Sequence, residues 1–232
     1  MKYEIIGANL QMVRAELGVG EGIMAEAGAM VNMSGHMKME SRMTGGIIGG
    51  LKRVIAGESL FLTRFSPLGL PGFVSFAGNV PGKIFQVTLD GNREFIAQRD
   101  SFLCCDEGIT LDAALVKKFR TGLFAGNGFI LQKMRGNGSA FLHCCGDIIA
   151  LNLKEGEIIK VQTGLVVGFD STVTYDIMLA GGITSIVFGG EGLFVTTLTG
   201  PGIVILQSMD IAKIASSIIP YLPKPNVETK KA

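Results

Sequence analysis

An internal repeat is the feature that most constrains this chain. Residues 54–76, 123–142 and 187–206 read VIAGESLFLTRFSPLGLPGFVSF, LFAGNGFILQKMRGNGSAFL and VFGGEGLFVTTLTGPGIVIL. Each stretch opens with two apolar residues, a small residue and a glycine, runs apolar, turns at Gly or Pro, and runs apolar again. Self-similarity at a fixed period is the mark of a repeat architecture, so it decides the fold before any single motif does.

A second set of landmarks lies upstream of each stretch and gives the same period. Alternating segments end at Leu17, Leu89 and Leu153, and each is followed by a polar, Gly-containing turn. The chain then resumes with the apolar pairs Ile23–Met24, Phe95–Ile96 and Ile158–Ile159. These pairs are 72 and then 63 residues apart, and the repeat-turn glycines Gly57, Gly126 and Gly190 are 69 and then 64 apart. We therefore expect three copies of a β unit of about 65–70 residues.

The turns between apolar runs indicate strands. Gly136-Asn137-Gly138 separates two apolar runs, and Asn-Gly in that position is a strong hairpin signal. Pro71-Gly72 and Pro201-Gly202 stand at the corresponding turns of the other copies. The expected fold is all-β, with three internal repeats closed about a pseudo-threefold axis. A homo-oligomer, expected to be a trimer, would extend that symmetry.

The chain divides into one domain, residues 1–222, and a tail. Its repeats are expected at about 1–82, 83–146 and 147–207, followed by a C-terminal helix at 208–222. That helix should start with Asp210 or Ser208 as its cap and stop near Pro220. The polar stretch 223–232 is expected to be disordered.

Composition limits the function classes. Hydrophobic residues make up 47% and charged residues 18%, yet no uninterrupted apolar run reaches the ~18–20 residues of a membrane span. We interpret the apolar excess as surface buried in an oligomer. A net charge of +1 argues against nucleic acid as a partner. Glu4 and Arg14 come too early for the apolar stretch of a signal peptide, so a cytoplasmic location is expected.

The four cysteines form two adjacent pairs, Cys104–Cys105 and Cys144–Cys145. Neighbours in a strand point to opposite faces, so neither pair offers two thiolates to one metal ion. One cysteine from each pair could meet together with His143 or His36 to form a site, but reduced, buried thiols are the favoured interpretation. No metal and no cofactor is expected.

One segment suggests a partner-binding or membrane-binding arm. GIIGGLKRVIA, residues 46–56, has a weak helical pattern because of its glycines. Its apolar face and its two cations are Ile47, Ile48, Leu51, Val54 and Ile55, with Lys52 and Arg53. The arm could touch anionic headgroups or a partner, or it could dock on its own oligomer. Docking on the oligomer is favoured, because two positive charges supply little attraction to a membrane surface. Its resemblance to a phosphate-binding loop fails because Leu51 stands where Lys is required.

The remaining candidates for chemistry favour structural roles. Met30, Met33, His36, Met37, Met39 and Met43 could suit copper(I), but methionines at a core or an interface are favoured. His143 lies in an apolar strand and is expected to be structural. Glu58 and Glu191 follow repeat-turn glycines, but Asn127 replaces them in the middle copy, so turn geometry explains all three. No catalytic residue is assigned, and an enzyme is not expected.

The motifs MTGGIIGGLKRVIAGESLFLTRF (43–65), GLFAGNGFILQ and GGEGLFVTTLTGPGIVILQ resemble a known family. It is the bacterial and archaeal branch of the altered-inheritance-of-mitochondria (mitochondrial biogenesis) proteins, long carried as a domain of unknown function. The resemblance covers nearly the whole chain. It implies a three-repeat, double-stranded β-helix-like fold similar to the subunit of the tryptophan RNA-binding attenuation protein, assembled as a trimer. The mitochondrial relatives are linked to inner-membrane organisation, and the family has no catalytic residues to transfer.

The sequence therefore predicts a non-enzymatic, trimeric β scaffold that presents a surface to a protein partner or, as a peripheral protein, to a membrane. One alternative is an RNA-binding module by fold analogy. It would need a charge repeated in register, but Arg64 and Lys133 are matched by Thr197. The other alternative is a β-barrel that binds a small ligand or acts as an enzyme.

Overall fold

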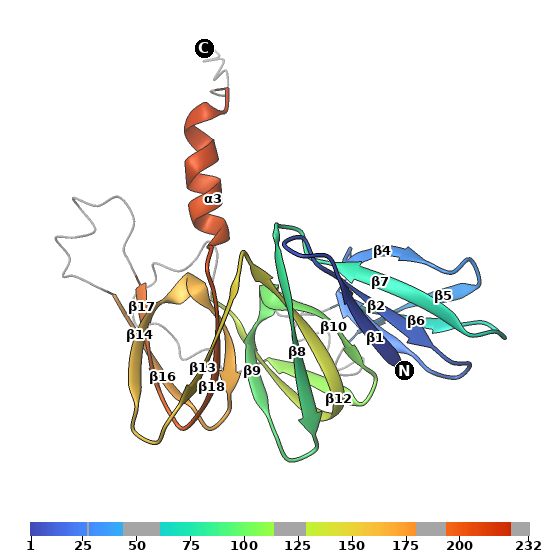
Figure 1. Cartoon of the computed structure of the whole chain (residues 1–232), viewed down its shortest axis with the longest axis horizontal. Coiled ribbons are helices and arrows are strands. Elements are labelled where there is room, and N and C mark those ends of the chain that lie inside the picture. Colours follow the sequence, from blue (N-terminus) through green and yellow to red (C-terminus); the bar gives the residue numbers. More distant parts are fainter. Residues whose placement is uncertain (27, 44–60, 114–128, 180–193, 224–232) are drawn as a thin grey trace, which may run out of the picture.

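Antiparallel strands make up most of the molecule, and a short α-helix follows the last strand (Figure 1). The structure, a computed structural model, describes residues 1–26, 28–43, 61–113, 129–179 and 194–223. The expected all-β class with a short C-terminal helix is confirmed. Among the described residues, no helix has the length and apolarity needed to cross a membrane.

The strands fall into three consecutive sets. The first set is β1 (Lys2–Ile6), β2 (Met12–Leu17), β3 (Ile23–Glu26), β4 (Met30–Met33), β5 (Met37–Met43), β6 (Phe61–Pro67) and β7 (Gly72–Ala77). The second is β8 (Gly82–Asp90), β9 (Phe95–Gln98), β10 (Phe102–Asp106), β11 (Ile109–Ala113) and the long β12 (Leu131–Cys145). The third is β13 (Ile148–Leu153), β14 (Ile158–Gln162), β15 (Val166–Asp170), β16 (Thr174–Leu179), β17 (Phe194–Thr199) and β18 (Gly202–Gln207).

Corresponding strands pair in corresponding register. In the β2–β7, β8–β12 and β13–β18 pairs, Leu17 faces Gly72, Leu89 faces Gly138, and Leu153 faces Gly202. The three leucines that mark strand ends in the sequence are thus each opposite the turn glycine of the returning strand. Each Leu is buried, because period-two alternation turns it toward the core.

A bulge recurs at one position in each set. The β4–β7, β10–β12 and β15–β18 ladders shift register between Met30 and Asn32, between Phe102 and Cys104, and between Val166 and Gly168. An extra residue in one strand bends that strand and increases its twist. The strands β4, β10 and β15 therefore bend at equivalent positions.

Consecutive sets are joined by strand pairing. β10 of the second set pairs with β3 of the first, and β15 of the third pairs with β9 of the second (Figure 1). In the described residues β4 and β14 are not paired with each other, and they lie at opposite ends of the molecule. Within the described part of the chain the series of sets is therefore open, and the expected closure about an axis within one chain is not confirmed.

One landmark of the third set differs from expectation by a residue. Arg64 faces Met24 and Lys133 faces Ile96, whereas Thr197 faces Lys160. The counterpart of the pairs Ile23–Met24 and Phe95–Ile96 is therefore Ile159–Lys160, and not Ile158–Ile159. Burial explains the difference, because Ile158 is 60% exposed while Ile159 packs against the core.

Three groups of buried apolar side chains form the core, and each group lies mainly in one set. The groups contain, among others, Phe65 and Phe76 in the first set, Phe95 and Phe102 in the second, and Phe169 and Val204 in the third. Cys104 belongs to the first group and Cys105 to the second, so these neighbours do point to opposite faces. The cysteine pair is thus part of the packing between two sets.

Candidate interaction surface

The C-terminal helix α3 (Ile211–Ile218) begins at a defined cap. Asp210 accepts a hydrogen bond from the Ala212 N–H at 2.9 Å, and its charge favours the helix N-terminus. Ser208, the other expected cap, instead accepts from the Asp147 N–H at 2.8 Å. The last turn, Ile219–Tyr221, is a 3-10 helix that contains Pro220, which cannot donate to a continuing helix.

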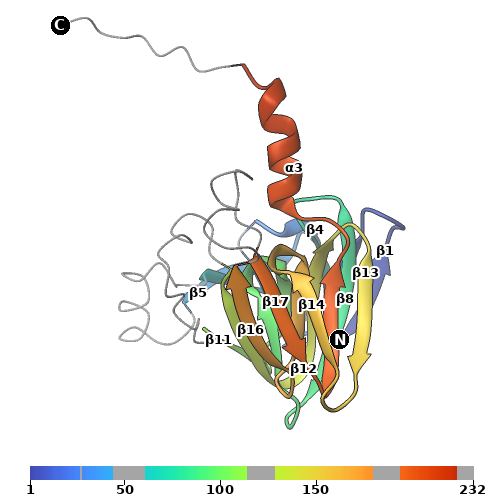
Figure 2. The same cartoon turned by 90° about the vertical axis from the view of Figure 1, so that its left-hand side faces the viewer.

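Apolar side chains form a stripe along this helix that no other part of the described chain covers. Their spacing of three and four residues places them on one face. The stripe consists of Ile211, Ile214, Ala215, Ile218 and Leu222. None of the helix residues is buried, and Ile211 and Leu222 are 57% and 56% exposed. Figures 1 and 2 show α3 projecting away from the sheets, so the stripe is available for contact.

The opposite face of α3 carries Lys213, Ser216 and Ser217. The Ser216 and Ser217 hydroxyls donate to backbone carbonyls of the same helix, both at 2.7 Å. Lys213 is thus the single charge on the helix itself. A helix that binds anionic membranes usually has several Lys or Arg residues on its polar face.

Hydrogen bonds attach the base of α3 to the sheets. The Met209 N–H donates to the Cys145 carbonyl at 3.2 Å, and the Gln162 side chain donates to Asp210 at 3.3 Å. Gln207 bridges two more segments: it accepts from the Cys145 N–H and donates to the Gly164 carbonyl, both at 2.9 Å. The base of the helix is therefore held against both the end of β12 and the third set of strands.

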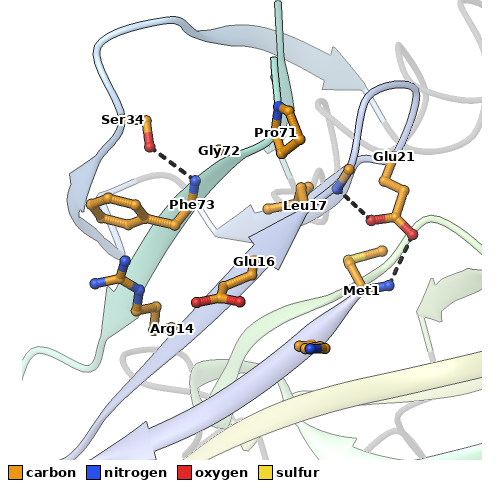
Figure 3. A pocket seen from close by; sticks show the side chains of 11 residues that line it. Met1, Arg14, Glu16, Leu17, Glu21, Ser34, Pro71, Gly72 and Phe73 are labelled. Atoms are coloured by element: carbon orange, nitrogen blue, oxygen red, sulfur yellow. Dashed lines mark hydrogen bonds and ion pairs between the residues drawn. The ribbon is translucent and has the colours of Figure 1, made fainter.

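The first set of strands also carries a shallow depression (Figure 3). The Arg14 guanidinium lies 3.7 Å from the centre of the Phe73 ring, a cation–π contact. Glu16 is on the same face of β2, two residues along. Ser34 accepts from the Phe73 N–H at 3.0 Å. Arg14 and Glu16 are of opposite sign, and no nucleophile with an adjacent base lines this depression.

The arm and the repeat-turn glycines lie outside the described residues. This applies to Ile47, Ile48, Leu51, Lys52, Arg53, Val54 and Ile55, and to Gly57, Gly126 and Gly190. Their roles stay predictions.

The methionine-rich segment contributes mainly to packing. Met37 is buried, and Met30 and Met33 pack against the first core group. Met39 is 47% exposed and lies in β5, which ends its sheet among the described strands. A ring nitrogen of His36 is 3.1 Å from the Pro71 carbonyl oxygen. Among the described residues, no three His, Cys, Asp or Glu side chains are placed to hold a metal ion.

The cysteines and His143 are buried groups with altered acidity. All four cysteines are free thiols in the core, and burial raises the pKa of Cys104, Cys105 and Cys144. Burial also lowers the pKa of His143, an effect that a hydrogen bond with the Val80 backbone partly offsets. His143 packs against Gly82, where a Cβ would lie 2.9 Å from its Nε2 atom. These groups are arranged as packing and not as nucleophiles.

The fold and this surface define a class: an antiparallel β protein that carries an exposed amphipathic helix at its C-terminal end. The chain belongs to the mitochondrial biogenesis AIM24 family, whose model matches residues 3–209. The family resemblance seen in the sequence is thereby confirmed. The match spans nearly all the described strands and stops at the base of α3.

Two streptococcal proteins are similar to this chain. It is 26% identical over 220 residues to an uncharacterised protein of Streptococcus pyogenes serotype M6, M6_Spy0233, covering 91% of this chain and 87% of that one. The crystal structure of protein SPYM3_0169 from Streptococcus pyogenes superposes with a TM-score of 0.79. That alignment covers 95% of this chain and 99% of the other at 23% identity, so it shows a shared fold alone.

Proposed function

We propose that this protein is a non-enzymatic β scaffold that assembles into a trimer and presents α3 to a protein partner. The observation that supports this most is the apolar stripe of α3, which is fixed at its base and uncovered along its length. An amphipathic helix with apolar residues at i, i+3, i+4 and i+7 is the form that docks into an apolar groove of another protein.

We further propose that the three sets of strands are three copies of one unit. The recurring Leu–Gly register and the recurring bulge support this, because unrelated hairpins have no reason to share both. Closure about a symmetry axis would then be completed by several chains and not inside one. The likeness to the subunit of the tryptophan RNA-binding attenuation protein belongs to the same proposal.

A protein partner is favoured over a membrane because α3 carries Lys213 as its single charge. The arm at residues 46–56 remains a separate candidate for membrane contact, and deleting residues 43–56 tests it. RNA binding is disfavoured because the two cations at the repeated strand position, Arg64 and Lys133, already form ion pairs. Arg64 Nε lies 2.5 Å from Glu107 Oε1, and Lys133 Nζ lies 2.7 Å from Glu94 Oε2.

The test compares two variants that should fold equally well. Ile211→Ser with Ile218→Ser removes the stripe, while Ser216→Ala changes the polar face. All three positions are exposed, so each variant should retain the wild-type free energy of unfolding within about 0.5 kcal/mol. Proteins that co-purify with the wild type from native cells are identified, and the purified candidate is titrated against all three forms.

We expect at least tenfold weaker binding for the Ile double variant and unchanged binding for Ser216→Ala. Sedimentation with phosphatidylglycerol vesicles is run in parallel. Vesicle binding that depends on the isoleucines would replace the protein partner with a membrane. If the double variant binds both the partner and the vesicles like the wild type, α3 is not the binding surface.

A further inference from the structure

Two strands at opposite ends of the molecule have an unpaired edge in the described chain. β4 pairs only with β7, and β14 pairs only with β17. Their counterparts in the other sets are paired on both sides: β10 lies between β12 and β3, and β15 lies between β18 and β9. The pairing between neighbouring sets occurs twice inside the molecule, as β10 with β3 and as β15 with β9. The strand β4 at one end of the molecule and the strand β14 at the other end each correspond to one partner of that pairing (Figure 1).

The two internal junctions share one antiparallel register. At the first, Cys104 faces Ala25, Cys105 faces Met24, and Asp106 faces Ile23. At the second, Gly168 faces Ala97, Phe169 faces Ile96, and Asp170 faces Phe95. A side-chain hydrogen bond recurs there too, since Asp106 accepts from the Ser139 N–H at 2.8 Å and Asp170 from the Ile203 N–H at 2.9 Å.

The free edges contain the counterparts of these junction residues. By the shared bulge, Asn32, Met33 and Ser34 of the β4 end correspond to Cys104, Cys105 and Asp106. Ser34 accepts from the Phe73 N–H, just as Asp106 accepts from Ser139. By the shared register with β17, Ile159, Lys160 and Val161 correspond to Ile23, Met24 and Ala25.

Burial differs between the internal junctions and the free ends at the same positions. The bulge residues Leu103 and Val167 are 2% and 0% exposed, whereas their counterpart Val31 is 52% exposed. At the other free edge, Ile159 is only partly buried, whereas its counterparts Ile23 and Phe95 are both 0% exposed. Apolar side chains that are buried at both internal junctions are thus more exposed at the free ends. An unpaired, apolar strand edge is a template for another strand.

The charges at the two free ends are compatible with pairing. In the shared register, Lys160 would face the uncharged Met33, and Ile159 would face Ser34. At the internal junction Arg93, two residues before Phe95, pairs with Asp170 at 2.8 Å. Its counterpart at the free end is Glu157, which would approach the uncharged Ser34. No like charges are brought together.

We infer that β14 of one chain pairs antiparallel with β4 of a second copy of the same chain, with Asn32 facing Val161, Met33 facing Lys160, and Ser34 facing Ile159. The inference rests on the assembly proposed above and specifies its interface. The contact is head-to-tail, so it repeats from chain to chain and forms a ring where the rotation closes.

A disulfide placed in this register tests the inference. Asn32→Cys with Val161→Cys puts two thiols directly opposite each other, within the reach of a disulfide. The four native cysteines are buried, so they do not compete. The control is Asn32→Cys with Lys160→Cys, which is one residue out of register and points its second thiol to the other face.

After mild oxidation we expect dimer and trimer bands on a non-reducing gel for the first variant, at least tenfold stronger than for the control and lost with a reductant. Light scattering of both variants, reduced, distinguishes the failures. An oligomer without the register-specific cross-link overturns the β4–β14 pairing and leaves assembly intact. A monomer at micromolar concentration overturns both the pairing and the proposed trimer, but leaves the partner role of α3 standing.

Discussion

Replacing Asp170 should show most clearly how much more an internal junction contributes to stability than a free end does. Its carboxylate is 15% exposed and makes two contacts across different strands. One oxygen accepts from the Ile203 N–H at 2.9 Å, and the other lies 2.8 Å from Arg93 Nε. Asp170→Ala removes both contacts, the one with Arg93 across the β9–β15 junction and the one with Ile203 in β18.

The expected loss follows from these two contacts. A hydrogen bond from a backbone N–H to a charged acceptor contributes about 1.5–3 kcal/mol. The ion pair contributes about 0.5–1 kcal/mol, because the Arg93 side chain is about a third exposed and solvent screens it. Asp170→Ala should therefore destabilise the protein by about 2–4 kcal/mol. Asp170→Asn keeps an acceptor for Ile203 and should cost about 1 kcal/mol.

Urea unfolding at one fixed protein concentration measures these differences, since assembly also shifts apparent stability. Ser34→Ala is the matched control. Ser34 makes the same hydrogen bond, to the Phe73 N–H, but at a free end and without an ion pair. It should cost about 1 kcal/mol. A loss for Asp170→Ala no larger than that for Ser34→Ala would refute the extra stabilisation assigned to the charged acceptor and its ion pair with Arg93.

Three further predictions use separate parts of the molecule. Gly168→Ala would place a Cβ 2.5 Å from Phe95 Cε1 and 2.7 Å from the Ile96 carbonyl oxygen. Thermal unfolding should therefore show a loss of about 1–3 kcal/mol in the free energy of unfolding. Gly35→Ala is the control and should show no loss, because a Cβ there meets open space. His143 has a lowered pKa when folded, so its contribution to stability is complete above about pH 6.5 and is lost as the pH falls. His143→Gln should flatten the decrease in unfolding free energy between pH 7 and pH 5, and an unchanged slope would contradict the assignment. The four buried thiols should react with a thiol reagent in urea but not in native buffer, and fast native reaction would show that the core opens.

Local patterns in the sequence predicted much of this fold. The Leu–turn–apolar landmarks marked strand ends, because a Leu at the end of an alternating strand must face the core and a turn must follow it. Asp210 and Pro220 bounded the C-terminal helix, since capping and the missing proline N–H act within one turn. The adjacent cysteines were placed on opposite faces by strand geometry alone.

What the sequence could not predict depends on contacts between distant segments. The one-residue difference at Ile159 arises because Ile158 and Ile159 are equally apolar, and only pairing with β17 decides which faces the core. The open series of sets and its two free edges follow from which strands pair across units, and composition does not determine this. The isoleucine spacing in α3 was visible in the sequence, but its exposure depends on where Ser208 and Gln207 attach the helix.

The mass of the native assembly in solution tests the central claim most directly. Multi-angle light scattering after gel filtration should give about 74 kDa, three times the 24.6 kDa of one chain, across a tenfold range of micromolar concentrations. A mass of one chain throughout that range would contradict an assembled scaffold.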